Sequence, residues 1–329
     1  MTTYKGSAIA HPIQGLIKYH GKIDEYLRLP SHNSISVNIG KFYTHTTVEI
    51  TDEIDENVMT IDGKSAKHEA IQRLNRIWEA FKKLVNITDD FRLKVVSENN
   101  FPSRVGLGSS ASGYAALTVA IADALGIREL GIKELSKIAR LGSGSASRSI
   151  VGGFSEWVMA TTHEESYSYR LAGDEVPLKM VLAVIPKVKD LPTTLAQVET
   201  EKSPFYPTRL GYIPTMLRKM RDAIKAGDVD EIGRLAEIDT LNLHAVIMTG
   251  PSGTILWRPE TIEVIRRVKQ MRREGVKAYY SIDTGATVFI NTWENYVDEV
   301  ISRLEDVQGI DLYVSGVGLE AKAVEKHII

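Results

Sequence analysis

The pattern of apolar and polar positions in the first hundred residues predicts short strands, turns and one helix. Polar and apolar residues alternate over 34–39, which predicts a half-buried strand in a region of short strands and turns. Residues 43–50 and 91–97 are predicted as further strands, and Asp62 and Gly63 as a turn between strands. Helical spacing of apolar residues predicts a helix through Ile71, Leu74, Trp78 and Phe81.

Two segments rich in glycine and serine lie in the middle of the chain, and each adjoins a predicted helix. The first segment, 106–113, precedes a helix that is expected to end at Gly126. The apolar residues of that helix are predicted to share one face: Tyr114, Leu117, Ile121, Ala124 and Leu125. A second helix over 133–141 leads into the other segment, 142–153.

The second half of the chain mixes predicted helices and strands without regular βαβ units. A continuous apolar run over 180–185 predicts a fully buried strand. A long connection, typical of a domain boundary or of active-site loops, is then marked by Pro186, Pro192, Pro204, Pro207 and Pro214. The elements predicted after it are helices over 214–226, 229–245, 260–273 and 297–304, a strand–turn–strand unit over 278–290 and a strand over 312–314. This mixture predicts an α+β fold with two domains, 1–180 and 181–329.

The composition excludes several classes of function. The 329 residues include 40 basic and 42 acidic side chains, a net charge of −2, so the chain does not bind nucleic acid through bulk positive charge. The absence of cysteine excludes disulfides, a thiolate nucleophile and cysteine-bound metals. The N-terminus lacks a signal-peptide core, and no apolar run approaches the ~20 residues of a membrane helix. We therefore expect a cytoplasmic protein with neither nucleic acid nor a membrane as its partner.

The segment 106–113 (GLGSSASG) has the composition of a phosphate-binding loop. Glycines permit positive φ and close approach of a ligand, while the free N–H groups and the dipole of a helix start attract phosphate. The segment is not a Walker A sequence, and a glycine-rich turn with a capping serine is the alternative interpretation. The residues predicted to hold the nucleotide cofactor are Gly106, Leu107, Gly108, Ser109, Ser110, Ala111 and Ser112.

Four segments, in order along the chain, resemble the mevalonate-diphosphate-decarboxylase branch of the GHMP small-molecule kinases. Residues 101–113 resemble the phosphate loop of these kinases. Residues 18–22 (KYHGK) together with 29–37 resemble the branch's "KYWGK…LP…S-S-L-S-V". Residues 139–157 resemble "ARxGSGSACRSxxGGFxEW", and residues 278–290 resemble "AYTFDAGPNAV". The resemblance implies a GHMP-kinase fold in which a ribosomal-protein-S5-like N-terminal half and a ferredoxin-like C-terminal half enclose one cleft.

The reaction that this resemblance implies depends on ATP and Mg²⁺. The γ-phosphoryl group passes to the tertiary 3-hydroxyl of a mevalonate derivative, and phosphate and CO2 then leave to give an alkene. The matching positions place the catalytic residues Asp283 and Lys18 at the hydroxyl and Arg148 at the substrate carboxylate. Asp283 also lies in a turn between two apolar strands, where an Asx turn is the alternative use of a carboxylate. Ser109 and Ser110 are the residues expected at the metal.

The resemblance also implies a pocket for the distal phosphate of the substrate. The substrate-binding residues that it implies are Tyr19, His20, Lys22, Ser143, Gly144, Ser145 and Arg148. Ser143 and Ser145 alternate with glycine, as in a nest of backbone N–H groups and hydroxyls that binds an anion. An ordinary serine–glycine loop is the alternative interpretation of this segment.

Departures from the diphosphate pattern favour a smaller substrate anion. His20 stands where the diphosphate enzymes have Trp, and residues 190–194 (DLPTT) stand where bacterial diphosphate enzymes have Ser-Ser-Arg, so one cationic donor is missing. The stretch 10–21 (AHPIQGLIKYHG) resembles the phosphomevalonate decarboxylases of some archaea and bacteria. We therefore expect conversion of 5-phosphomevalonate to isopentenyl phosphate, and the family resemblance implies a homodimer. The alternatives are a diphosphomevalonate decarboxylase, a mevalonate 3-kinase relative and a non-catalytic nucleotide-binding paralogue.

Overall fold

The computed structural model describes residues 3–102, 105–127, 129–186 and 193–329 and, of residues 193–195, the backbone alone. The strands, in chain order, are β1 Tyr4–Ala10, β2 Ile13–Ile17, β3 Lys22–Asp24, β4 Leu29–Pro30, β5 Ser34–Asn38, β6 Thr44–Thr51, β7 Val58–Ile61, β8 Lys64–Ser65, β9 Arg92–Asn99, β10 Phe154–Trp157, β11 Ser168–Ala172, β12 Lys179–Val184, β13 Ala278–Ser281, β14 Val288–Thr292, β15 Asp311–Ser315 and β16 Lys322–Ala323.

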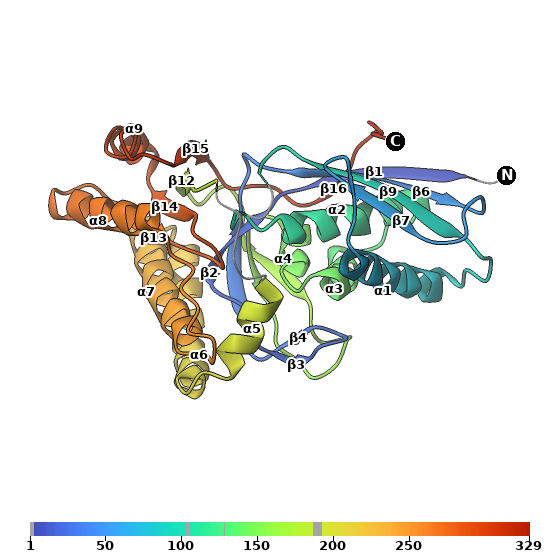
Figure 1. The fold of residues 1–329 in the computed structure, drawn as a ribbon, viewed down its shortest axis with the longest axis horizontal. Coiled ribbons are helices and arrows are strands. Elements are labelled where there is room, and N and C mark those ends of the chain that lie inside the picture. Colours follow the sequence, from blue (N-terminus) through green and yellow to red (C-terminus); the bar gives the residue numbers. More distant parts are fainter. Residues whose placement is uncertain (1–2, 103–104, 128, 187–192) are drawn as a thin grey trace.

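The α-helices, in chain order, are α1 His68–Val85, α2 Ser109–Ala124, α3 Ile132–Gly142, α4 Ala146–Val151, α5 Thr193–Glu201, α6 Tyr206–Ala226, α7 Val229–Met248, α8 Pro259–Arg273 and α9 Val297–Ser302. A 3₁₀ turn, Glu294–Tyr296, precedes α9. Figure 1 shows α1 to α4 gathered under the sheet that contains β1, β6 and β9, whereas α6 to α9 lie at the opposite end of the molecule with β12 to β15.

The first sheet has the strand order β16-β1-β6-β9-β7-β8. The strands predicted over 43–50 and 91–97 are confirmed as β6 and β9, which pair along their whole length. The predicted turn at Asp62 and Gly63 is confirmed as well, because both residues have positive φ, 49° and 73°, between the antiparallel strands β7 and β8.

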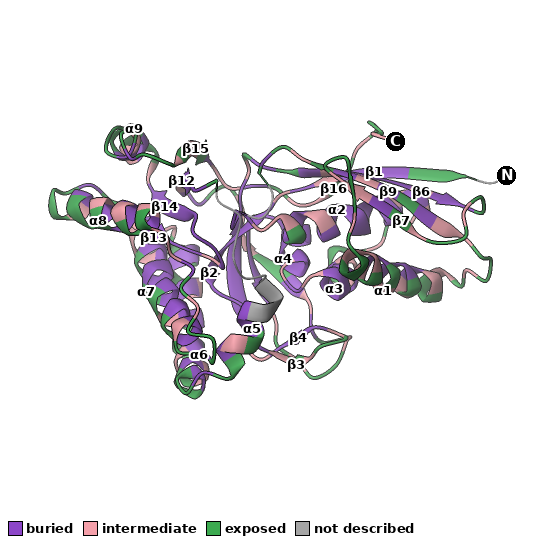
Figure 2. Cartoon of the chain, in the orientation of Figure 1, coloured by how far each residue is buried: buried purple, intermediate pink, exposed green. Residues whose placement is uncertain are grey.

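Helix α2 packs on this sheet, and four of the five residues predicted to share its apolar face are buried: Tyr114, Leu117, Ile121 and Ala124. Residues on every side of α2 are buried, including Ala116, Thr118 and Ala120. The helix contacts β1 and β6 of the sheet as well as the helices α3 and α4, and α4 is coloured as buried in Figure 2. Small residues allow this close packing: a Cβ at Gly6 would lie 2.3 Å from the carbonyl oxygen of Ala120.

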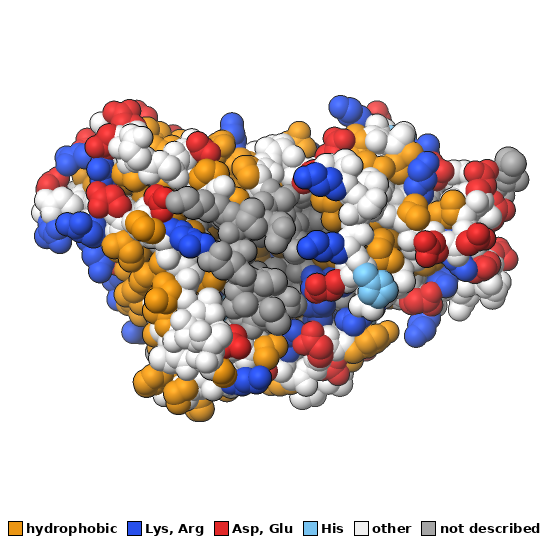
Figure 3. Space-filling model, viewed as in Figure 1, with side chains coloured by type: hydrophobic (Ala, Val, Ile, Leu, Met, Phe, Trp, Pro, Cys, Tyr) orange, Lys and Arg blue, Asp and Glu red, His pale blue; other side chains and the backbone are white. Residues whose placement is uncertain are grey.

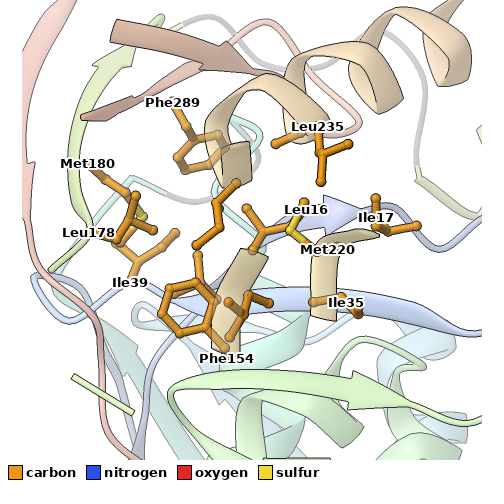
Figure 4. Packing of buried hydrophobic residues seen from close by; sticks show 14 of the residues in the cluster. Leu16, Ile17, Ile35, Ile39, Phe154, Leu178, Met180, Met220, Leu235 and Phe289 are labelled. Carbon is orange, nitrogen blue, oxygen red and sulfur yellow. The ribbon is translucent and has the colours of Figure 1, made fainter. Parts of the chain in front are cut away.

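The second sheet, β11-β10-β5-β2, forms the centre of the molecule. The stretch 34–39 was predicted to be half-buried, but every residue of β5 is buried. Helix α4 covers one face, where the Nδ2 of Asn38 donates to the carbonyl of Ser149 at 3.1 Å. The other face contributes Ile35 and Val37 to an apolar core that also contains Met220 of α6 (Figure 4).

The third sheet, β13-β14-β12-β15, supports the predicted Asp-Thr-Gly turn. The run over 180–185 is confirmed as the buried strand β12, which lies between β14 and β15. The strand–turn–strand unit is confirmed as β13 and β14, which pair in antiparallel fashion with Tyr280 opposite Ile290. Residues 282–287 connect these strands and place Asp283 at the end of the sheet.

The prediction of a long connection marked by prolines was only partly correct, because this stretch contains α5 and the first two turns of α6. Pro207 occupies the first turn of α6, where the missing N–H has no helical partner to lose. Pro214 lies inside the helix, next to the buried Ile213. The burial of one side of α6 in the common core holds the helix together across this proline.

The two halves share one apolar core, in which Leu16, Ile35 and Phe154 meet Met180, Met220 and Phe289 (Figure 4). The C-terminal end of the chain also returns to the first sheet, where β16 pairs with β1. Since the two halves share a core and the C-terminal strand pairs in the N-terminal half, the predicted division into domains at residue 180 stays a prediction.

Basic and acidic side chains are intermixed on the face in Figure 3, as the small net charge predicts. In the described part of the chain, no helix is both long and apolar enough to span a membrane.

Candidate active site

The glycine-rich segment forms the start of α2. Gly106 and Gly108 have positive φ, 97° and 73°, and Gly108 is the N-cap residue, so no side chain caps the first turn. Uncapped N–H groups at a helix start fit a phosphate group and, with the hydroxyls of Ser109 and Ser110, its metal ion. No group of three or more His, Cys, Asp and Glu side chains suited to a metal occurs among the described residues, so the metal would depend on phosphate oxygens and water.

The other members of the predicted nucleotide loop point into the protein. The side chains of Leu107 and Ala111 are buried, so these residues offer a ligand only their backbone. The hydroxyl of Ser112 is also buried and lies 2.6 Å from the Oγ1 of Thr44 on β6. Ser112 therefore joins α2 to the sheet, whereas Ser109 is half-buried and Ser110 is exposed.

The loop before α2 touches the turn that contains Asp283. The Oγ1 of Thr287 donates to the carbonyl of Val105 at 2.5 Å, although the two residues are 182 positions apart in the chain. A Cβ at Gly106 would lie 3.5 Å from the Cα of Gly285. The two segments that the sequence singles out for phosphate and for the hydroxyl therefore meet in space.

Asp283 and Lys18 form an ion pair at this junction. The Nζ of Lys18 lies 3.1 Å from Asp283 Oδ1, 2.8 Å from the Oγ of Ser281 and 2.6 Å from the carbonyl of Gly15. The N–H of Gly15 donates to both oxygens of Asp283, at 3.2 and 3.0 Å. The side chain of Lys18 is 3% exposed and that of Asp283 is 23% exposed. The carboxylate is thus held in place while part of it stays open to a reactant.

Arg148 lies on α4, close enough to Asp283 for the two charges to interact. Burial lowers its pKa to about 10, and the charge of Asp283 opposes that shift, so the guanidinium stays charged at neutral pH. One terminal nitrogen donates to the Oγ of Ser34 and the other lies 3.3 Å from the Oγ of Ser145. The group rests on Trp157, and its Nε has no partner among the described residues. Free donors remain for an anionic ligand.

The predicted phosphate pocket surrounds the start of α4. The rings of Tyr19 and Trp157 lie 4.6 Å apart, and a Cβ at Gly144 would lie 3.0 Å from Tyr19 and 2.7 Å from Trp157. Glycine is therefore required at position 144. The hydroxyl of Tyr19 is buried without a described partner, and burial raises its pKa. Ser143 and Ser145 flank this glycine, next to Arg148.

His20 and Lys22 already have protein partners. The ring nitrogens of His20 lie 3.0 Å from the Oγ1 of Thr200 on α5 and 3.2 Å from the Oγ1 of Thr284. The ammonium of Lys22 forms an ion pair with Glu25. His20 therefore links α5 to the Asp283 turn, and a phosphate that binds Lys22 competes with a carboxylate. Of the loop 190–194, residues 190–192 and the side chains at 193 and 194 lie outside the described residues.

Three histidines near the site are buried, and their pKa values are lowered. Burial is the main cause in each case; the cation Arg209 contributes further at all three histidines, and Lys18 at His20 and His244. The pKa of His20 lies well below 6.5, that of His32 is about 4 and that of His244 is about 3. These imidazoles are neutral at physiological pH.

We expect the free energy of unfolding to fall as the pH drops below about 6.5. The unfolded chain then binds more protons than the folded protein, and each of these histidines lowers stability by up to about 1.4 kcal/mol per pH unit. Urea unfolding between about pH 7.5 and about pH 5 measures how steeply the free energy of unfolding changes with pH. The variant His32→Asn should reduce this slope by about the contribution of one histidine. Identical slopes for the wild type and this variant would contradict the assignment.

Several residues of the site were given no role from the sequence. Ser281 holds the ammonium of Lys18, and Ser34 and Trp157 hold the guanidinium of Arg148. Arg209 and Asp239 lie in α6 and α7 and contact the main chain of Lys18. Ser34 and Trp157 lie inside segments that resemble family motifs, which was the one signal for them.

Comparison with known proteins gives one consistent result. A family model described as the diphosphomevalonate decarboxylase-like N-terminal domain matches residues 10–168, and one described as the mevalonate 5-diphosphate decarboxylase C-terminal domain matches residues 180–319. The phosphomevalonate decarboxylase of Haloferax volcanii is 40% identical over 324 residues, which cover 98% of each chain.

Solved structures agree with the sequence comparison. The mevalonate diphosphate decarboxylase from Staphylococcus aureus is 32% identical, with a TM-score of 0.91 over 98% of this chain and 99% of its own. The structure of MDDEF in complex with MVAPP, AMPPCP and magnesium is 30% identical, with a TM-score of 0.91 over 99% of this chain and all of its own. The expected α+β fold of the GHMP-kinase type is therefore confirmed.

Proposed function

Since the chain belongs to the diphosphomevalonate decarboxylase family, we propose that it is the ATP-dependent decarboxylase of (R)-5-phosphomevalonate in an isoprenoid pathway. The products are isopentenyl phosphate, ADP, phosphate and CO2. The observation that supports a reaction at this site is the contact, through Val105 and Thr287, between the start of the phosphate loop and the connection 282–287, which carries the Asp283 carboxylate that pairs with Lys18. The 40% identity to a phosphomevalonate decarboxylase favours the monophosphate as substrate.

The proposed first step transfers the γ-phosphoryl group to the 3-hydroxyl. Asp283 orients this hydroxyl and accepts its proton as the oxygen–phosphorus bond forms, while the bond to ADP breaks. Lys18 pairs with the carboxylate and neutralises the oxygens of the transferred group. The first turn of α2 holds the ATP phosphates, and a Mg²⁺ ion at Ser109 and Ser110 would balance their charge.

The proposed second step releases phosphate and CO2. Arg148 holds the substrate carboxylate through its free donors, so that the carbon–carbon bond lies in the correct orientation. The electron pair of that bond forms the alkene as the phosphate at carbon 3 departs with its oxygen. Tyr19, Ser143, Gly144 and Ser145 would hold the 5-phosphate at the other end of the substrate.

One assay tests this function directly. Purified protein is given ATP, Mg²⁺ and, in turn, mevalonate, 5-phosphomevalonate and 5-diphosphomevalonate, and ADP and CO2 are measured. We expect equimolar ADP and CO2 with the monophosphate. A strong preference for the diphosphate would assign the second candidate function, which the similarity to the Staphylococcus aureus enzyme supports. ADP without CO2 would indicate a kinase, and ATP binding without any product would indicate a paralogue without activity.

The setting of the reaction is part of the proposal. We place the enzyme in the cytoplasm, as a homodimer, with residues 1–180 and 181–329 on either side of the substrate. The lack of cysteine suits a reducing compartment. Sedimentation at several protein concentrations measures the oligomeric state, and a single monomer mass at every concentration would contradict the dimer.

Replacement of Arg148 by alanine should impair decarboxylation more than nucleotide binding. Loss of a charge-assisted hydrogen bond of about 1.5–3 kcal/mol corresponds to a decrease of about 10- to 150-fold in kcat/KM for the mevalonate ester. The affinity for ATP should change less than about twofold. Arg170→Ala, which removes a half-exposed arginine paired with Glu320, is the matched control. An unchanged rate in Arg148→Ala would remove this residue from the site.

A further inference from the structure

A buried ion pair forms hydrogen bonds with the main chain of Lys18. Arg209 of α6 and Asp239 of α7 lie 3.0 Å apart, and both side chains are fully buried. Asp239 Oδ2 accepts from the N–H of Lys18 at 2.8 Å, and the Nη2 of Arg209 donates to the carbonyl of Lys18 at 2.9 Å. The pair thus binds both backbone polar groups of Lys18, its N–H and its carbonyl, from helices that are about 200 residues away in the chain.

Stability alone does not explain a pair of this kind. The removal of two charges from water is expensive, and apolar residues of similar volume often give a protein of equal or greater stability. Lys18 follows directly after β2, so its N–H and carbonyl need partners outside the sheet ladder. The ion pair supplies these partners at the residue whose side chain contacts Asp283.

Helix α7 also holds the other half of the catalytic pair. The Oγ1 of Thr240 accepts from the N–H of Ile282 at 3.2 Å, directly before Asp283. The Nε2 of His244 lies 3.4 Å from the carbonyl of the same residue. One stretch of α7 therefore contacts the backbone on both sides of the Lys18–Asp283 ion pair, and Asp239 provides the contact on the Lys18 side.

We propose that Arg209 and Asp239 are positioning residues, which fix Lys18 so that its ammonium stays at Asp283 and at the transferring phosphoryl group. This inference rests on the proposed function, because it assigns the pair to the chemical step rather than to substrate binding. A misplacement of about 1 Å at such a site reduces the rate by about 10²-fold. Neither Arg209 nor Asp239 needs to touch a reactant for this effect.

The variant Asp239→Asn tests the proposal, because it keeps the size of the side chain and removes its charge. We expect kcat to fall by about 10- to 100-fold while KM for ATP and for the mevalonate ester changes less than about threefold. Arg209→Lys should retain more of the rate than Arg209→Met, because lysine preserves a cation beside Asp239. Equal rates in these two arginine variants, or an unchanged kcat in Asp239→Asn, would overturn the proposal.

A second ion pair, in which the carboxylate is fully buried and the arginine is 39% exposed, provides the control. Glu156 of β10 is fully buried and binds Arg221 of α6 through both oxygens, but it has no contact with Lys18. Glu156→Gln should lower the thermal stability by an amount similar to Asp239→Asn and leave kcat within about twofold of the wild type. A loss of kcat in both variants, in proportion to lost stability, would assign Arg209 and Asp239 a structural role only.

A crystal structure of the Asp239→Asn protein keeps this test independent of the substrate. We expect the distance from Lys18 Nζ to Asp283 Oδ1 to exceed the salt-bridge limit of about 4 Å. A distance unchanged from 3.1 Å would refute the positioning role even if the protein prefers another mevalonate ester or none. If Asp239→Asn does not fold, Arg209→Met is used for the same measurement with the same two outcomes.

Discussion

Replacement of Asp283 by asparagine is expected to reduce ADP formation and CO2 release together, by about 10²- to 10⁴-fold. Asparagine has the same shape and still accepts from the N–H of Gly15, but it takes up no proton from the 3-hydroxyl. It also loses the charge that pairs with Lys18. Since the phosphate loop does not change, ATP should bind with its wild-type affinity. Rapid-quench measurement of ADP and of CO2, with nucleotide binding by calorimetry, gives all three quantities.

Asp174→Asn is the control for this experiment, because Asp174 is an exposed carboxylate on another loop. Its rates should equal those of the wild type. Wild-type rates in Asp283→Asn would refute the role of Asp283. Loss of CO2 release with undiminished ADP formation would place Asp283 in the second step instead of the first.

Replacement of Lys18 by methionine is expected to lower phosphoryl transfer by about 10²- to 10³-fold, the usual effect of removing one donor that stabilises a developing charge. Methionine keeps the length of the side chain but cannot donate to Gly15, Ser281 and Asp283. The transferred oxygens then lack their cation as well. A single-turnover assay with ATP labelled in the γ-phosphate measures the transfer without the later steps.

Lys179→Met provides the comparison, since Lys179 pairs with Glu294 on the surface of the third sheet. We expect that variant to react at the wild-type rate, in agreement with the small energies of exposed ion pairs. If Lys18→Met transferred phosphate as fast as Lys179→Met, the ammonium of Lys18 would have no part in the reaction.

Local sequence patterns were enough to predict the two chain segments of the candidate site. Glycine at positions 106 and 108 permits the positive φ that both residues adopt, and the apolar spacing after them predicts the helix, whereas the absence of a side-chain cap was not predicted. The turn at Asp283 was likewise predicted from two apolar strands on either side of it. Their contact through Thr287 and Val105 depends on the whole fold, and it was expected only from the family resemblance.

Other features depend on distant parts of the chain, so no local pattern could reveal them. The alternation in β5 predicts one buried face, yet α4 and α6 cover both faces. Pro207 was interpreted as part of a connection, although proline is also common in the first turn of a helix. Arg209 and Asp239 have the appearance of ordinary helix residues until α6 and α7 pack against Lys18.

A crystal structure with AMPPCP, Mg²⁺ and 5-phosphomevalonate would show whether the phosphate loop and Asp283 act on the same pair of reactants. We expect the γ-phosphate of the analogue at the first turn of α2 and the 3-hydroxyl of the substrate within about 3.2 Å of Asp283, on the side of the carboxylate that faces this phosphate. A nucleotide bound away from residues 106–112, or a substrate hydroxyl directed away from Asp283, would contradict this expectation.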